Sequence, residues 1–392
     1  MPPGADASIP GWRSLWEPRR VRLWLAAAIV AAWLPLLGVW LRGWLDFSAF
    51  YAAGALAFTP ELTSLSAAVA FQAAHGMPIT PWVYPAGLAL LYVPFAWLPY
   101  PVAGALHAAL EALLLAAAAW MGAPMVGIPR RWALIGAFAW APAAAGVISG
   151  QNTGLALFLV VLAARWLASW PRAGLVVGLL AYKPQLFAPQ AGLLAWRGLW
   201  RALLAVVAVL AGHYVLGVMA TGGDWSWPRP WLEAVRTYTG PDFRANGWQA
   251  VSLPAFGSWL EAATGIGAPF LTLGGYAAGA AVLAAALPAL RRWPARASVA
   301  MAAAIGLVIS PHAWVYDATL LLPALAVFVS AAGSRGWPWQ DRWLLAAAYG
   351  LALAWPLGRF IGIDPLIIVV TLAPAVLLGW GPFRRFRVIA EA

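Results

Sequence analysis

Long apolar runs, separated by short polar turns, recur along almost the whole chain. Each run holds roughly 17–25 residues, the length that a helix needs to cross the hydrocarbon core of a bilayer. The strands of a β-barrel would instead alternate apolar and polar residues. The pattern therefore predicts an all-α polytopic integral membrane protein with about twelve transmembrane segments, at residues 21–41, 82–98, 101–122, 132–149, 152–168, 173–196, 199–220, 267–290, 297–311, 313–332, 342–358 and 363–380.

Composition supports the membrane class. Hydrophobic residues make up 63% of the chain and charged residues only 9%, a balance that excludes a water-soluble domain. Many of the 27 tryptophans lie near predicted segment ends, as expected for an aromatic belt in the headgroup region. The chain has no cysteine, which excludes disulfides, a thiolate nucleophile and cysteine-based metal sites.

Arginines carry almost all of the net charge of +11, and we attribute them to topology and anionic lipids rather than to nucleic acid. Arginines flank both ends of the hydrophobic region, so the positive-inside rule places both termini in the cytoplasm. We expect a single membrane domain at residues 21–380 between cytoplasmic tails at 1–20 and 381–392. Its main outer loops are then about 42–81 and 221–266. The arginine bias is typical of a high-GC bacterium, which points to the bacterial cytoplasmic membrane.

Threading the chain through twelve segments leaves one conflict. Arg130, Arg131 and Arg172 fall on the outer side, against the positive-inside rule. The conflict indicates that one of the middle segments is re-entrant or only half-spanning. It leaves the topology of residues 82–200 open.

Asp46 is the most informative acidic residue, because it directly follows the first apolar run in a chain with only 13 acids. A carboxylate where a segment leaves the bilayer is a candidate catalytic base for a membrane-borne substrate. The alternative is an ordinary N-cap of a short helix, a role that aspartate fills well. We expect two short amphipathic helices in the interface after it, at about 50–58 and 65–74.

Three further polar motifs interrupt apolar segments, where ionisable and amide side chains are costly. Lys183 precedes Pro184, which breaks the helix there, and a lysine at such a bend can bind phosphate or pair with a buried acid. Gln151 and Asn152 join two apolar runs and can bind a sugar or cap the next helix. His312 lies at another junction, with Asp317 about one turn on, and can contact phosphate, assist proton transfer or satisfy local hydrogen bonds.

Other polar residues carry weaker expectations. His107 and Glu111, spaced i and i+4, predict a simple intrahelical pair. Asp46 has no neighbouring acid, so we expect neither a metal nor another cofactor; a metal held by Asp224 or Asp242 of the second outer loop, folded over the site, stays the alternative. A Gly-rich phosphate loop, zinc-type histidine spacing and a Ser-His-Asp order are absent from the sequence, which excludes nucleotide-fuelled transport and a soluble Rossmann domain.

Four motifs together resemble glycosyltransferase family 87, the polyprenyl-phosphate-mannose-dependent α-mannosyltransferases. They occur in the family's order and span about residues 40 to 325. The chain departs from the pattern after Tyr84-Pro85, where a second proline is expected in place of Ala86. The motifs are Asp46-Phe47 with Tyr51-Ala52-Ala53-Gly54, Tyr84-Pro85, Gly150-Gln151-Asn152 followed by Lys183-Pro184-Gln185, and Ser310-Pro311-His312 with Trp314.

The resemblance implies a GT-C-type fold with the active site on the outer face and a lipid-linked sugar phosphate, such as polyprenyl-phosphate mannose, as donor. Asp46 matches the family's catalytic base. A single obvious carboxylate favours one displacement with inversion. The acceptor is a lipid or a glycan. We expect the remaining motif residues, and Arg244 of the second outer loop, to bind substrate; the substrate-binding set is Lys183, His312, Gln151, Asn152, Tyr51, Tyr84 and Arg244.

Two other classes of protein fit part of the pattern. A secondary transporter or a flippase for lipid-linked sugars would also carry a broken helix with a lysine, but its key residues should lie near the bilayer midplane. A non-catalytic scaffold should lack the Asp46 carboxylate. Asp46 and His312 both fall at the predicted outer boundary, which favours the transferase.

Overall fold

The computed structural model describes residues 19–35, 38, 45–167, 169–265 and 269–379. Over these ranges the chain is helical and forms no β-strand; one isolated bridge pairs Ala250 with Trp314. The fold class is therefore all-α, as predicted. The predicted tails at 1–20 and 381–392 lie outside the described residues, except for Arg19 and Arg20 at the start of α2 (Arg19–Trp33).

The helices differ widely in length, from one turn to more than six. The remaining α-helices are α4 (Phe47–Leu56), α5 (Leu65–Ala74), α6 (Val93–Ala96), α7 (Tyr100–Gly122), α8 (Arg130–Ala139), α9 (Ala141–Ser149), α10 (Thr153–Trp166), α11 (Trp170–Leu179), α12 (Pro184–Trp196), α13 (Trp200–Ala220), α14 (Pro228–Asn246), α15 (Leu253–Thr264), α16 (Phe270–Arg292), α17 (Ala295–Ile309), α18 (Leu322–Ser334), α19 (Trp339–Leu353), α20 (Gly358–Ile361) and α21 (Leu366–Gly379). The 3₁₀ turns are η1 (Pro60–Thr63), η2 (Ala86–Leu91), η3 (Ala123–Val126), η4 (Leu180–Tyr182), η5 (Gly247–Gln249), η6 (Val315–Leu321) and η7 (Trp355–Leu357).

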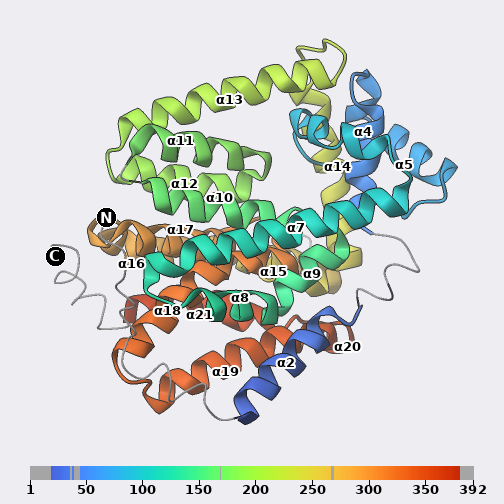
Figure 1. Cartoon of the computed structure of the whole chain (residues 1–392). Helices are drawn as coiled ribbons and strands as arrows, with labels where there is room; N and C mark the ends of the chain where they lie inside the picture. The colour runs from blue at the N-terminus through green and yellow to red at the C-terminus, as the bar shows by residue number, and fades with distance from the viewer. Residues whose placement is uncertain (1–18, 36–37, 39–44, 168, 266–268, 380–392) are drawn as a thin grey trace.

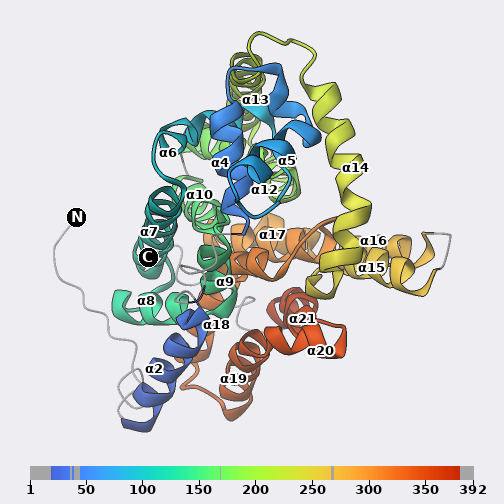
Figure 2. The same ribbon diagram turned by 90° about the vertical axis from the view of Figure 1, so that its right-hand side faces the viewer.

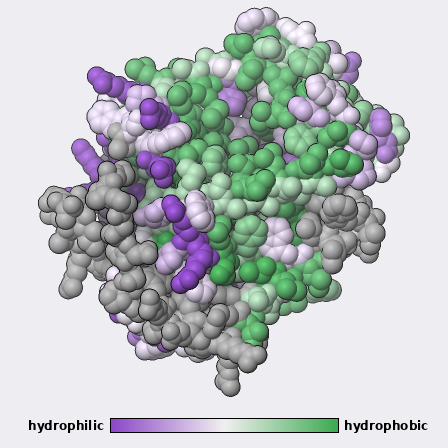
Figure 3. All heavy atoms as spheres, in the orientation of Figure 1, coloured by the Kyte–Doolittle hydropathy of each residue, from purple (hydrophilic) through white to green (hydrophobic). Residues whose placement is uncertain are grey.

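Apolar helices make this an integral membrane protein. Four helices of the described residues are long and apolar enough to cross a bilayer, or six if each of two bent pairs counts as one span. This count bears out the membrane class but does not establish the predicted twelve spans. Most long helices run side by side across the view of Figure 1, and hydrophobic residues cover the middle of that face in Figure 3.

The predicted segment 82–98 does not form a continuous helix. It contains an extended stretch, the turn η2 and the four-residue α6, none long enough to span a bilayer. The chain packs these pieces against protein, since Trp82, Ala86, Leu88 and Ala89 are buried. Hydropathy made the segment look like a membrane span because burial in protein and burial in lipid select the same side chains.

The predicted segment 173–196 is a hairpin. Gly174 lies against the backbone of Ala202, and Gly178 lies against Val209, so α11 and α13 run parallel. Because α12 joins the end of α11 to the start of α13, it must run back toward the side where α11 began. Lys183 forms the tip, with an extended backbone (φ −121°, ψ 88°) of the kind that a following proline favours.

These two deviations remove the conflict over the arginines. Without a crossing at 82–98, Arg130 and Arg172 move to the other side of the bundle. The hairpin then keeps Arg197 on the side of Arg172. Arg197 donates to the backbone carbonyls of Leu290 and Arg291, so the end of α16 lies on that side too.

The segment predicted to be the first outer loop also differs in part from expectation. Residues 65–74 form α5 as predicted, but the first helix, α4, begins at Phe47. Most of α4 is buried, including Phe47 and Phe50 at below 2% exposure. It is therefore a packed element rather than an amphipathic helix in the interface. Figure 2 looks onto the end of the molecule where α4, α5 and α14 lie.

Candidate functional site

Asp46 lies at the start of α4, half-buried, and its side chain makes no capping hydrogen bond to that helix. The N-cap alternative is therefore wrong for this residue. Its carboxyl instead hydrogen-bonds with the side chains of Gln151 and Ser149. Its backbone N–H donates to the carbonyl of Ser149 at 2.8 Å, which ties α4 to the end of α9.

A glycine permits this close approach. Gly150 has a positive φ of 83°, and a Cβ at this position would lie 2.5 Å from the Cβ of Phe47. Both features require glycine, because other residues avoid this backbone conformation and would collide with Phe47. The Gly150-Gln151 motif is thus where α9 meets Asp46.

Tyr84 orients the next residue of that motif. Its hydroxyl donates to Gln151 Oε1 at 2.9 Å, which leaves the Gln151 amide N–H₂ group to donate to Asp46. Gln151, the middle of this chain of hydrogen bonds, is 5% exposed, whereas Tyr84 and Asp46 at its two ends are half-buried. Burial also raises the pKa of the Tyr84 hydroxyl well above its usual value, which keeps that group a proton donor.

The environment raises the pKa of Asp46 to about 6. Burial is the largest cause, since it disfavours the charged form, and the negative charge of Asp242 acts in the same direction. Hydrogen bonds from Gln151 and Ser149 and the charge of Lys183 lower it in part. A carboxylate with a pKa near 6 is suited to general-base catalysis near neutral pH.

Lys183 at the tip of the hairpin is buried and paired. Its Nζ lies 3.3 Å from Asp317 Oδ1, and both side chains are 3% exposed. The other carboxylate oxygen of Asp317 accepts from the backbone N–H of Trp314 at 3.1 Å. Lys183 also lies over the ring of Tyr316 at 5.6 Å. The buried-acid alternative for Lys183 is thus present, and its charge still acts on Asp46.

His312 forms the third polar contact of the site. Its Nε2 lies 2.7 Å from Asp242 Oδ2, in α14. Burial by itself raises the pKa of Asp242, but hydrogen bonds from His312, Asn246 and Tyr238 and the charge of His312 hold it below its usual value. Ser310 fixes the backbone of the same motif, accepting from the His312 N–H and donating to its carbonyl.

The structure thus gathers five of the eight predicted site residues, and it adds Asp242 and Asp317 to them. The gathered residues are Asp46, Tyr84, Gln151, Lys183 and His312. Sequence analysis noted Asp317 near His312 but not its pairing with Lys183. Asp242 was named there only as an alternative metal ligand, and its contact with His312, 70 residues away, was not predicted.

The three other predicted residues lie apart from this cluster. Asn152 is fully buried beside Tyr92, and its carbonyl accepts from Tyr182. The hydroxyl of Tyr51 donates to the carbonyl of Leu98 at 2.8 Å. Arg244 is exposed in the last turn of α14, where no described contact joins it to Asp46.

The expected pairing of His107 with Glu111 is not made. Glu111 accepts from the backbone N–H groups of Gly154 and Leu155 at 2.7 and 3.2 Å, and so caps α10. His107 packs among aromatic rings, the nearest being Phe47 at 4.9 Å. Glu111 therefore contacts the start of α10 and His107 contacts α4, and the two residues do not pair with each other.

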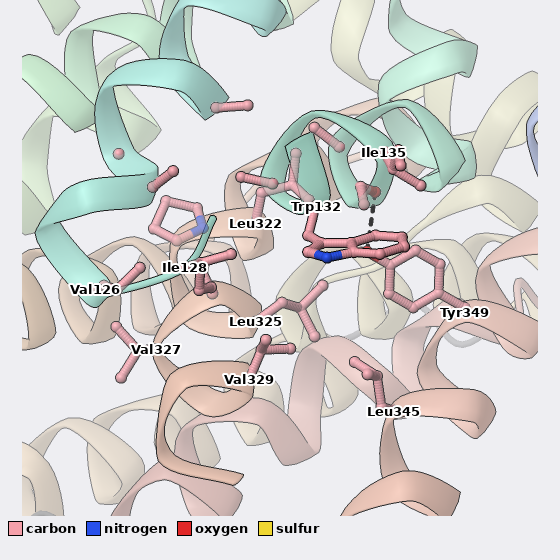
Figure 4. A pocket seen from close by; sticks show the side chains of 18 of the residues that line it. Val126, Ile128, Trp132, Ile135, Leu322, Leu325, Val327, Val329, Leu345 and Tyr349 are labelled. Atoms are coloured by element: carbon pink, nitrogen blue, oxygen red, sulfur yellow. Dashed lines mark hydrogen bonds between the residues drawn. The ribbon is translucent and has the colours of Figure 1, made fainter. Parts of the chain in front are cut away.

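A large apolar cavity lies among the helices. It has a volume of about 920 Å³ and is lined mainly by aliphatic residues of α7, α8, α10, α18 and α19. Figure 4 shows Trp132, Leu322, Leu325 and Tyr349 around it. Trp140 is fully buried, packs against the lining residue Tyr349 and donates to the carbonyl of Ala318 at 3.0 Å. The lining of the cavity is suited to binding a hydrocarbon chain rather than to catalysis.

No group of three or more potential metal ligands occurs among the described residues. The model of glycosyltransferase family 87 matches residues 82–311, more than half of the chain. That range contains Tyr84, Gln151, Lys183 and Asp242, and it ends before His312. No curated protein and no solved structure matches the chain.

Proposed function

This chain belongs to glycosyltransferase family 87, and we propose that it transfers mannose from a polyprenyl-phosphate donor to a hydroxyl of a lipid or glycan acceptor. We place the reaction at the outer face of a bacterial cytoplasmic membrane. Asp46 acts as the general base, and the reaction inverts the anomeric configuration. The half-buried Asp46 carboxyl, with its pKa raised to about 6, is the observation that carries this proposal.

The donor already carries a good leaving group, so the enzyme must bind the phosphate, deprotonate the acceptor and align the two. Asp46 takes the acceptor proton. His312 and Lys183 supply positive charge for the developing phosphate, since preorganised charge stabilises the transition state. Lys183 has three N–H donors, and its contact with Asp317 leaves others for a phosphate oxygen.

The arrangement of charged residues supports an outer active site. The starts of α8 and α13 and the end of α16 carry arginines, and they lie at the left of Figure 1. The site residues of α4 and α14 belong to the opposite end. The positive-inside rule places the arginine-rich end in the cytoplasm. The apolar cavity offers hydrocarbon-lined space within the bundle for part of the lipid tail.

The test is transfer of radiolabelled mannose from polyprenyl-phosphate mannose by the purified protein in nanodiscs. Acceptors would be membrane lipids and glycans. We expect Asp46→Asn to lower transfer by roughly 10²–10⁴-fold, the contribution typical of a general base, while donor binding is retained.

Equal transfer by both proteins would remove Asp46 from the chemistry. Movement of lipid-linked sugar across the bilayer, with no transfer to any acceptor, would instead support a flippase. Transfer is measured in nanodiscs, and movement across the bilayer is measured with the same protein in sealed liposomes.

A further inference from the structure

Asp242 is a fully engaged carboxylate in the middle of the outer loop. It is 3% exposed and receives three side-chain contacts. Tyr238 and Asn246 donate to its Oδ1 at 3.1 and 2.7 Å, one turn before and one turn after it in α14. Its Oδ2 is left for His312 Nε2 at 2.7 Å. The helix therefore fixes one oxygen and aims the other at the histidine.

The His312 ring is held on its remaining sides by aromatic residues. Trp314 lies edge-on at 4.5 Å between ring centroids, and Phe243 lies edge-on at 5.9 Å. The ring is one-third exposed. Among the residues that the structure describes, none hydrogen-bonds to its Nδ1. One nitrogen is thus committed to Asp242 and the other is left for a substrate.

The loop after α14 is pinned to the same motif. Ala250 bridges Trp314, Val251 donates to the carbonyl of Ala313 at 3.0 Å, and Ser252 Oγ donates to the carbonyl of Ser310 at 2.8 Å. These contacts hold α14 and the His312 segment as one unit.

We propose that Asp242 is the positioning residue of the active site, holding His312 by Nε2 so that Nδ1 faces the phosphate of the donor. This inference rests on the proposed function. It explains why a buried carboxylate stands beside Asp46, although its charge raises the pKa of the base. Orienting carboxylates of this kind fix both the tautomer and the direction of a histidine ring.

The step balances without a further reactant. Asp46 takes the proton of the acceptor hydroxyl, and the acceptor oxygen bonds to the anomeric carbon. The bond from that carbon to the phosphate oxygen breaks, and its electron pair stays on the phosphate. In its imidazolium form His312 donates a hydrogen bond from Nδ1 to that oxygen and keeps its proton.

Other charged and titratable groups surround this pair. Tyr238 faces Asp242 from α14, Tyr316 and Asp317 belong to η6, and Lys183 lies between η4 and α12. A readout of activity alone cannot isolate His312 from these groups. The decisive measurement must therefore report on the ring itself.

The experiment is ¹⁵N NMR of the full-length protein labelled at histidine, since the chain has only four. His312→Gln assigns the signal. We expect Nε2 to keep its proton throughout the titration in the wild type, while Nδ1 alone gains and loses one. Asp242→Asn should mix the tautomers, because a carboxamide can accept from Nε2 or donate to it. A wild-type ring protonated at Nδ1 in its neutral form would overturn the proposal.

Transfer assays supply the second readout. We expect Asp242→Asn to lower kcat by about 10–100-fold, as when the orienting partner of a functional histidine is lost. The same change made in His312→Gln should add little, since the two residues act as one unit. Independent, multiplying losses would mean that Asp242 is only structural. Tyr238→Phe is the matched control, because it removes one donor to Asp242 and leaves the His312 contact.

The experiments distinguish a failure of the proposed transfer reaction from a failure of the proposed role of Asp242. If the wild type transfers no mannose, the proposed donor is wrong, yet the NMR titration still decides whether Asp242 sets the tautomer. If transfer occurs and Asp242→Asn leaves both the tautomer and the rate unchanged, the positioning role is wrong and the transferase stands. Should Asp242→Asn not fold, the wild-type titration alone decides.

Discussion

Asp46 and Asp242 are two carboxylates of one site whose surroundings act on them in opposite directions. Burial raises the pKa of Asp46 to about 6, and two hydrogen bonds offset this only in part. Asp242 is also desolvated, but three side-chain donors and the charge of His312 hold its pKa below its usual value. One carboxylate can accept a proton near neutral pH and the other stays ionised. Environments that separate two acids in this way commonly separate their roles.

The largest loss of transfer is expected from a change in the backbone beside Asp46. Gly150→Ala should move Phe47 and Asp46, because the new Cβ collides with Phe47 and the positive φ costs roughly 1–2 kcal/mol. We expect transfer to fall at least as far as the lower limit for loss of the base, about 100-fold. Rates and thermal unfolding in nanodiscs would be measured together.

Gly240→Ala is the matched control beside Asp242. Gly240 lies in α14, and a Cβ there would meet only the guanidinium of Arg244 at 3.9 Å, an ordinary contact. Pro241 follows this position and disfavours a helical residue that carries a Cβ, so we expect no gain in helix stability, and the rate should be unchanged. Equal losses at both glycines would show that the site does not depend on the approach of α9 to Asp46.

Part of the site, around Gly150, could be predicted from local features of the sequence. Asp46, Gln151 and Lys183 each interrupt an apolar pattern, so each was visible from its neighbours alone. Asp242 was considered only as an alternative metal ligand, and its contact with His312 was not predicted, because an acid in a polar loop is unremarkable. Only the fold brings it to His312, 70 residues later in the chain.

In the fold, too, features set by neighbouring residues could be predicted, whereas features set by tertiary packing could not. The all-helical membrane class follows from composition, and the break at Lys183 follows from Pro184. Whether an apolar segment crosses the membrane depends on its neighbours. Residues 82–98 and 173–196 are as apolar as true spans, but packing turns one into short pieces and the other into a hairpin. The misplaced arginines were the available sign of this error.

Acid titration of activity sharpens the comparison. Since a general base must be deprotonated, kcat/KM should fall tenfold per pH unit below about 6, the acid limb of its pH profile. Gln151→Leu removes a hydrogen bond that lowers the pKa of Asp46. The acid limb of the kcat/KM profile should therefore move to higher pH. A bond of about 0.5–1.5 kcal/mol corresponds to a shift of up to about one unit.

Asn246→Ala is the counterpart on the other carboxylate. It removes a donor from Asp242 and should raise the pKa of that group, but it should leave the acid limb of the rate in place. If Asn246→Ala moved the limb and Gln151→Leu did not, the base would be Asp242, and the roles of the two residues would be reversed.

The smallest expected effect comes from Tyr84, which touches Asp46 only through Gln151. Tyr84→Phe removes the 2.9 Å bond to Gln151 Oε1 but leaves the amide free to reach Asp46. The acid limb should therefore move in the same direction as in Gln151→Leu, by a smaller amount, with a loss of less than tenfold at neutral pH. In the Gln151→Leu background the tyrosine change should have no further effect on the limb. A full and additive shift would mean that Tyr84 acts on Asp46 directly, as a group that reaches the carboxylate in the working enzyme.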